Sequence, residues 1–255
     1  MAYEHIGLEI KDAVAFITLR REPVNVLNIA MMKEINHALD GLAEEDGLLA
    51  LVFQARGKAF SAGVDIGEHL GDQVREMIEV FHGIFRRMDK LGLTSVAAVQ
   101  GAALGGGCEL AVYCDIVLAS AKARFGQPEI QVGVFPPIAA LILPRLIGRK
   151  KAYEMIVTGD NLTAEEARTL GLVNTVVEPE GLEAELGSVL DKLRRLSPLV
   201  LKKTRQAFVA GLKDQADQAL ADIESIYLDD LMSSHDAEEG LRSFLEKRKP
   251  AWRNQ

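Results

Sequence analysis

The spacing of apolar residues along the chain predicts short strands that alternate with helices. Residues 8–10 and 14–19 are typical of two strands joined by a tight turn. The continuous apolar run at 48–54 is typical of a buried strand. Helices are expected where apolar residues recur every three or four positions, at 29–42 and 73–91. The first third of the chain therefore follows the order strand, strand, helix, strand and helix.

The same alternation continues and then gives way to helices. Strands are expected at 96–99, 115–119 and 173–177, and helices at 108–113, 138–147, 149–158 and from a capping box at 163–166 to Gly171. From Gly181 onward the pattern is helical, with Pro198 and Pro250 as breaks. We therefore expect a strand-containing core over residues 1–190 and a helical region over residues 191–255.

A glycine-rich stretch from Gly101 to Gly107 lies between a predicted strand and a predicted helix, and we expect it to be a loop. Glycines let the backbone approach a ligand closely, and the first N–H groups of a helix have no intrahelical partner. Gly105 and its neighbours could therefore direct free donors at a developing negative charge. Glu109 would lie one turn into the same helix. A carboxylate beside such donors suits proton chemistry next to a carbonyl group.

Two glutamates stand in apolar segments of the sequence. Glu109 lies between Cys108 and Leu110, and Glu129 is followed by Ile130. A glycine cluster is most often a plain turn, and a glutamate in the first helical turn is favoured by the helix dipole alone. The apolar neighbours favour a functional interpretation instead, because glutamates usually lie on exposed polar surfaces and are rarely buried without a partner.

Composition narrows the range of partners. The 255 residues carry a formal net charge of −8, which gives no basic surface for nucleic acid or an anionic membrane. We find neither a signal peptide nor an apolar run of transmembrane length, so a cytoplasmic protein is expected. Cys108 and Cys114 lie six positions apart in one predicted helix, and the five histidines are scattered, so neither a disulfide nor a metal site is expected.

Four groups of residues, in order and suitably spaced, resemble the enoyl-CoA hydratase/isomerase (crotonase) superfamily. They lie at 59–66, 101–110, 125–129 and 158–173. The resemblance extends over nearly the whole chain. It implies an α/β fold built as a spiral of ββα units, followed by a helical trimerisation region. It also implies a homotrimer or a dimer of trimers, which apolar residues in the C-terminal helices favour as well.

The resemblance also implies a site and a reaction. By position, the N–H groups of Val64 and Gly106 would hold a thioester oxygen, and Glu109 and Glu129 would act together on water. The substrate-binding residues expected beside them are Ala62, Asp65, Ile66, Gly105 and Pro137. The implied reaction adds water across a C=C bond conjugated to a coenzyme A thioester, with Glu109 as base and Glu129 as acid, an order that the sequence leaves open. Coenzyme A belongs to the acyl-CoA substrate, and no separate cofactor is expected.

Three departures from the family pattern concern the substrate. Pro137 stands where family hydratases often have a glycine whose N–H helps to position the water, and proline has no N–H. Gly67 replaces a lysine of many relatives, and the loop 20–28 is short, so contacts with coenzyme A would differ. The stretches 60–65, 134–137 and 243–250 look most like cyclohexa-1,5-diene-1-carbonyl-CoA hydratases of anaerobic aromatic degradation. A cyclic dienoyl-CoA is therefore one expected substrate.

Other functions compete with hydration. Residues 59–63 are a degenerate form of the nucleophile elbow, so Ser61 with His235 could form a serine hydrolase site. That interpretation lacks the first glycine of the motif and leaves the two glutamates unexplained. The family resemblance also allows an enoyl-CoA isomerase or a ring-opening hydrolase of a CoA ester. A non-catalytic acyl-CoA-binding protein would keep the fold without using either glutamate.

Overall fold

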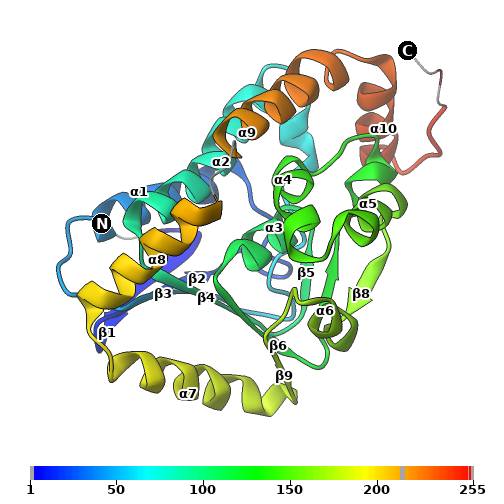
Figure 1. The fold of residues 1–255 in the computed structure, drawn as a ribbon. Helices are drawn as coiled ribbons and strands as arrows, with labels where there is room; N and C mark the ends of the chain where they lie inside the picture. The colour runs from blue at the N-terminus through cyan, green and yellow to red at the C-terminus, as the bar shows by residue number, and fades with distance from the viewer. Residues whose placement is uncertain (1–2, 213–215, 252, 254–255) are drawn as a thin grey trace.

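The larger of two sheets has six strands and forms the middle layer of the molecule (Figure 1). The computed structural model describes residues 3–212, 216–251 and 253. The strands are β1 (Ile6–Lys11), β2 (Val14–Leu19), β3 (Ala50–Ala55), β4 (Thr94–Val99), β6 (Ile116–Ser120) and β9 (Thr175–Val177), and they pair in that order. β1 and β2 form an antiparallel hairpin, and the later pairs are parallel. Parallel neighbours require crossover connections, which the helices supply.

Helices cover both faces of this sheet. Helices α1 (Ile29–Leu42), α2 (Gln73–Leu91) and α3 (Gly106–Tyr113) lie over one face, and α7 (Leu182–Arg194) lies over the other (Figure 1). In β3, Leu51 and Phe53 belong to the core under the first set of helices, whereas Ala50 and Val52 pack with α7. Burial on both faces explains why this strand reads as a continuous apolar run.

A second sheet of three short strands joins the glycine-rich loops. Its strands are β5 (Ala102–Leu104), β7 (Arg124–Gly126) and β8 (Asn161–Thr163), paired in the order β5-β7-β8. The expectation that residues 101–107 form a loop throughout is wrong, because β5 pairs with β7 and α3 already begins at Gly106. Strands of three residues are too short to show a periodicity in sequence.

The remaining helices follow the predicted order. They are α4 (Pro137–Leu146), α5 (Arg149–Thr158), α6 (Ala164–Leu170), α8 (Pro198–Leu212), α9 (Ala216–Ser225) and α10 (His235–Leu245), with the short turns η1 (Ile66–His69), η2 (Pro128–Val132) and η3 (Pro179–Gly181) and the π-helix η4 (Ile226–Leu231). The predicted helices 29–42, 73–91 and 149–158 match their observed bounds. The capping box is confirmed by reciprocal bonds between Thr163 and Glu166. The helical prediction beyond Gly181 is confirmed as far as Leu245, the end of α10, except that residues 213–215 lie outside the described part, as do residues 252 and 254–255.

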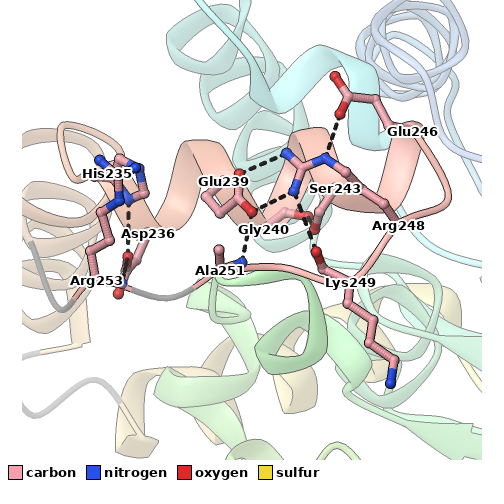
Figure 2. A network of polar contacts seen from close by, with 10 residues as sticks. All are labelled: His235, Asp236, Glu239, Gly240, Ser243, Glu246, Arg248, Lys249, Ala251 and Arg253. Atoms are coloured by element: carbon pink, nitrogen blue, oxygen red, sulfur yellow. Dashed lines mark hydrogen bonds and ion pairs between the residues drawn. The ribbon is translucent and has the colours of Figure 1, made fainter.

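The C-terminal helices pack on the core, and the end of the chain folds back onto α10. Tyr227 and Leu241 belong to the same apolar core as α1, α2 and α3. Beyond α10, the Arg248 guanidinium donates to both carboxylate oxygens of Glu239 at 2.6 and 2.7 Å (Figure 2). The N–H of Ala251 donates to Glu239 as well, at 2.7 Å. These bonds fix the segment after α10 against that helix.

Two global properties concern the described residues only. No helix among them is long and apolar enough to cross a membrane. They also contain no group of three or more histidine, cysteine, aspartate or glutamate side chains arranged to hold a metal ion.

Candidate active site

Two backbone N–H groups with no protein acceptor lie at the junction of two loops. Val64 forms an isolated bridge with Leu27, in which Leu27 N–H donates to Gly63 C=O at 2.9 Å and Asp65 N–H donates to Leu27 C=O at 3.0 Å. This bridge leaves the N–H of Val64 itself unused. Gly106 is the first residue of α3, where an N–H has no intrahelical partner. Within the described residues neither N–H is paired.

Glycines allow these two loops to touch. A Cβ atom added to Gly63 would lie 3.6 Å from the Gly106 nitrogen, and one added to Gly106 would lie 3.5 Å from the Val64 nitrogen. Gly63 has a φ of 104° and Gly105 a φ of 51°, conformations that favour glycine. The two free N–H groups are therefore held close together, as stabilisation of one anionic oxygen requires.

The carboxyl groups of Glu109 and Glu129 lie beside these donors. Glu109 is in the first turn of α3 and is 2% exposed, and its Oε1 accepts a hydrogen bond from Ala139 N–H at 2.7 Å. Glu129 is in η2, and its Oε1 lies only 2.5 Å from where a Cβ of Gly105 would stand. The Oε2 of Glu129 is buried and has no partner among the described residues. Both glutamates line one pocket.

Burial changes the protonation of this pair. Loss of water raises the pKa of Glu109 to about 7, although the N–H groups of Ala139 and Ile138 oppose the rise. Loss of water also raises the pKa of Glu129, and the negative charge of Glu109 raises it further. The pair therefore retains a proton at neutral pH, with Glu129 the more strongly protonated member. One ionised and one protonated carboxyl can act as base and acid in a single step.

The pocket has a volume of about 190 Å³ and a largely apolar wall. Its apolar lining comes from α2, from the segment before α4 and from the C-terminal helices, and includes Met77, Ile78, Phe81, Val134, Phe135, Leu241 and Phe244. Four of the five residues expected to bind substrate also line it, namely Ala62, Ile66, Gly105 and Pro137. An acyl group would meet an apolar surface on most sides.

Asp65, the fifth residue expected to bind substrate, does not line the pocket. Its Oδ1 accepts the N–H of Gly67 at 2.9 Å and caps η1, and its Oδ2 lies 4.0 Å from the Arg21 guanidinium. The capping role agrees with the preference of aspartate for helix starts. In this structure Asp65 shapes the loop that carries Val64.

The alternative serine site has no accessible nucleophile. Ser61 is fully buried, its Oγ accepts the N–H of Gly63 at 3.2 Å, and it does not line the pocket. His235 lies 3.1 Å from the Asp236 carboxylate at the start of α10. No hydrogen bond joins Ser61 to a histidine within the described part of the chain. The structure thus offers no support for serine hydrolysis.

Two polar residues of the pocket carry no signal in the sequence. His69 lines the pocket, donates from Nδ1 to the carbonyl of Asp65 at 2.9 Å, and has a pKa lowered by burial, so its ring is neutral. Tyr227 reaches the pocket from η4, near the other end of the chain. Only the tertiary fold brings residues so distant in sequence to the two glutamates.

Over nearly its whole length the chain is similar to known proteins. A family described as enoyl-CoA hydratase/isomerase matches residues 9–255. The chain is 34% identical to a cyclohexa-1,5-dienecarbonyl-CoA hydratase of Thauera aromatica, covering 98% of this chain and 96% of that protein. It is 36% identical to a short-chain-enoyl-CoA hydratase of Clostridium acetobutylicum, with 98% and 97% covered.

Solved structures agree on the fold. The crystal structure of an enoyl-CoA hydratase from Mycobacterium avium subsp. paratuberculosis superposes with a TM-score of 0.90 at 27% identity, covering 99% of this chain and 100% of that one. The expected α/β fold of the crotonase type, with two sheets and C-terminal helices, is therefore confirmed.

Proposed function

Since this chain belongs to the enoyl-CoA hydratase/isomerase family of enzymes, we propose that it adds water across a C=C bond conjugated to a coenzyme A thioester. The observation that carries the proposal is the pair of buried carboxyl groups of Glu109 and Glu129 in one pocket, beside two unpaired N–H groups. Each of the two carboxyl groups and each of the two N–H groups has a role in that reaction.

The paired N–H groups of Val64 and Gly106 stabilise negative charge on the thioester oxygen. When hydroxide adds at C3, the electrons of the double bond move onto the carbonyl oxygen as an enolate. Donors already oriented at that oxygen need no reorganisation, and losing one such donor typically costs roughly 2.7–4 kcal/mol of transition-state stabilisation. This pair lowers the barrier to addition.

The two glutamates move the protons of the reaction. Glu109, the member that ionises first, takes a proton from water as the water oxygen bonds to C3. Glu129, which holds its proton more strongly, delivers a proton to C2 as the enolate collapses. One proton is taken up and one is released, so water is added across the double bond without a net change in charge.

Replacing either glutamate by glutamine tests this assignment. We expect Glu109→Gln and Glu129→Gln each to lower hydration of an enoyl-CoA by at least about 10²-fold, because each removes a general acid or base. The loss of the ultraviolet band of the conjugated thioester reports the rate. Glu79→Gln, on the exposed side of α2, is the matched control and should retain full activity. Turnover like that of the wild type in either pocket variant, or isomerisation without hydration, would contradict the proposal.

We further propose that the acyl group is compact, either short or cyclic. Relatives of similar identity are named for a cyclic dienoyl-CoA, for short-chain enoyl-CoA and for crotonyl-CoA. The pocket of about 190 Å³, lined by Phe135, Tyr227 and the prolines Pro136 and Pro137, supports a small acyl group over a long chain.

A substrate panel tests this specificity. Crotonyl-CoA, a cyclic 1,5-dienoyl-CoA and a dodecenoyl-CoA should be compared by kcat/KM, with the long chain expected to be the poorest by at least about 10-fold. Pro137→Gly widens the wall at the start of α4 and should change the ratio of cyclic to linear turnover. A long-chain preference would contradict the compact acyl group, and an unchanged ratio would show that Pro137 does not shape the pocket.

A further inference from the structure

Tyr227 adds a hydroxyl group to the pocket that holds the two glutamates. It is 1% exposed, and its ring packs edge to face on Phe135, with ring centroids 5.1 Å apart. It lies in the π-helix η4, where Met232 N–H donates to Tyr227 C=O at 2.9 Å. Such wide turns are rare and occur frequently at functional sites. Here the wide turn carries a residue that lines the same pocket as the two carboxyl groups.

Two polar atoms at this pocket make no hydrogen bond within the described part of the chain. The Oε2 of Glu129 is buried and has no partner among the described residues. The hydroxyl of Tyr227, a residue that is 1% exposed, donates to none of the described residues either. Buried polar groups are normally paired, so an oxygen from water or substrate is expected beside Glu129 Oε2, in the pocket that Tyr227 also lines. Burial, together with the negative charges of Glu129 and Glu109, raises the pKa of Tyr227. The phenol keeps its proton and acts as a donor.

The other polar lining residues do not supply an equivalent donor. His69 gives its Nδ1 proton to a backbone carbonyl at 2.9 Å, and Gln131 directs its amide at another at 3.3 Å. Pro136 and Pro137 have no N–H. Among the described lining residues, Tyr227 carries the only hydroxyl.

We propose that the Tyr227 hydroxyl donates a hydrogen bond to the oxygen that bonds to C3, present as water before addition and as a hydroxyl group afterwards. This role rests on the hydratase function proposed above. A water molecule donates two hydrogen bonds and has two lone pairs. When its protons face the carboxyl groups of Glu109 and Glu129 and the phenol occupies one lone pair, the other lone pair is aimed at C3. Tyr227 thus orients the nucleophile.

Comparing two reactions of the enzyme, hydration and exchange of the C2 proton, distinguishes orientation of water by Tyr227 from a role in packing alone. Hydration needs the C3 oxygen, whereas exchange of the C2 proton of a saturated acyl-CoA in heavy water needs only the N–H pair and a carboxylate. We expect Tyr227→Phe, which keeps the ring on Phe135, to lower hydration at least about 10-fold and to leave exchange within about 2-fold. Exchange is followed by mass spectrometry. The ratio of the two rates does not depend on the fraction of folded protein. Tyr153→Phe, at a position 68% exposed on α5, is the matched control.

The outcomes of this experiment distinguish the proposed role of Tyr227 from the alternatives. A lower ratio of hydration to exchange in Tyr227→Phe supports the role, provided that Phe135→Leu, which disturbs the packing but keeps the hydroxyl, does not lower it. An equal fall in both reactions would assign Tyr227 to packing and overturn the inference. Unchanged hydration would also overturn it while leaving the proposed hydratase intact. A wild-type protein that hydrates no enoyl-CoA would instead overturn the proposed function, and this role with it.

Discussion

At the scale of single residues, burial of two acidic side chains in one pocket decides both chemistry and stability. Each carboxyl would be ionised at neutral pH in water, yet the apolar wall and their mutual repulsion favour retention of a proton. The folded protein therefore holds protons that the unfolded chain releases above about pH 4.5. The pair stabilises the fold least at high pH, because its pKa values are raised on folding.

Removing one of these ionisable groups should stabilise the protein in a pH-dependent manner. We expect Glu129→Gln to raise the free energy of unfolding at pH 8 by at least about 1 kcal/mol, since one pKa unit corresponds to about 1.4 kcal/mol. For a chain of this length, the melting temperature should rise by about 2–4 °C. The gain should be smaller at pH 5, which lies close to the unfolded pKa of 4.5, because retaining a proton in the folded state costs less there than at pH 8.

Thermal melting of the wild type and Glu129→Gln at pH 5 and pH 8 measures this effect. Glu79→Gln, an exposed substitution, should melt like the wild type at both values. A gain of equal size at both pH values would show that the stabilisation does not come from the buried charge.

At the scale of elements, one buried arginine fixes helix α8 to the sheet. Arg205 is 7% exposed and donates to Asp115 at 2.7 Å and to Asp89 at 3.3 Å. Asp115 also accepts bonds from the N–H and the hydroxyl of Ser95 in β4. This network connects α8 with α2 and with the turn between α3 and β6.

Arg205→Ala should therefore cost more than loss of a surface ion pair. Removing the guanidinium leaves two partly buried carboxylates without their cationic partner, although Ser95 and Tyr113 still donate to them, so we expect a loss of about 1–3 kcal/mol in the free energy of unfolding. Arg242→Ala, which breaks an exposed pair with Glu238, should cost at most about 1 kcal/mol. Urea unfolding of both variants gives the comparison, and equal losses would contradict the anchoring role.

At the scale of the whole molecule, apolar side chains on α8 support the proposal of a homotrimer or a dimer of trimers. Leu199, Val200 and Phe208 are 66%, 61% and 63% exposed. Not every apolar residue of the C-terminal helices is available for association, because Leu241 in α10 is buried in its own chain beside the pocket. Burial of these exposed apolar side chains in an interface between subunits would remove them from water.

Light scattering after size-exclusion chromatography tests this assembly. We expect the wild type to elute as a trimer or a hexamer, and Leu199→Glu combined with Phe208→Glu to shift it toward the monomer, because burying two charges in an interface is unfavourable. Tyr153→Glu, exposed on α5, controls for added surface charge. A monomeric wild type would contradict the proposal.

Local sequence decided most of the helices, and it also drew attention to the two glutamates. The helices at 29–42 and 73–91 follow from the recurrence of apolar residues, because that recurrence reflects the periodicity of a single helix. The apolar neighbours of Glu109 and Glu129 and the adjacent glycines are local features as well. Neighbouring residues are sufficient to encode these properties.

Tertiary structure alone decided which residues meet at the pocket. It brought Glu129 over Gly105 and Tyr227 to the same wall, and it directed Asp65 toward its own loop. The strands β5, β7 and β8 also depend on it, since three residues form a strand only when a distant partner is present. Contacts between segments far apart in sequence leave no periodicity in either segment, so they arise only when the chain closes on itself.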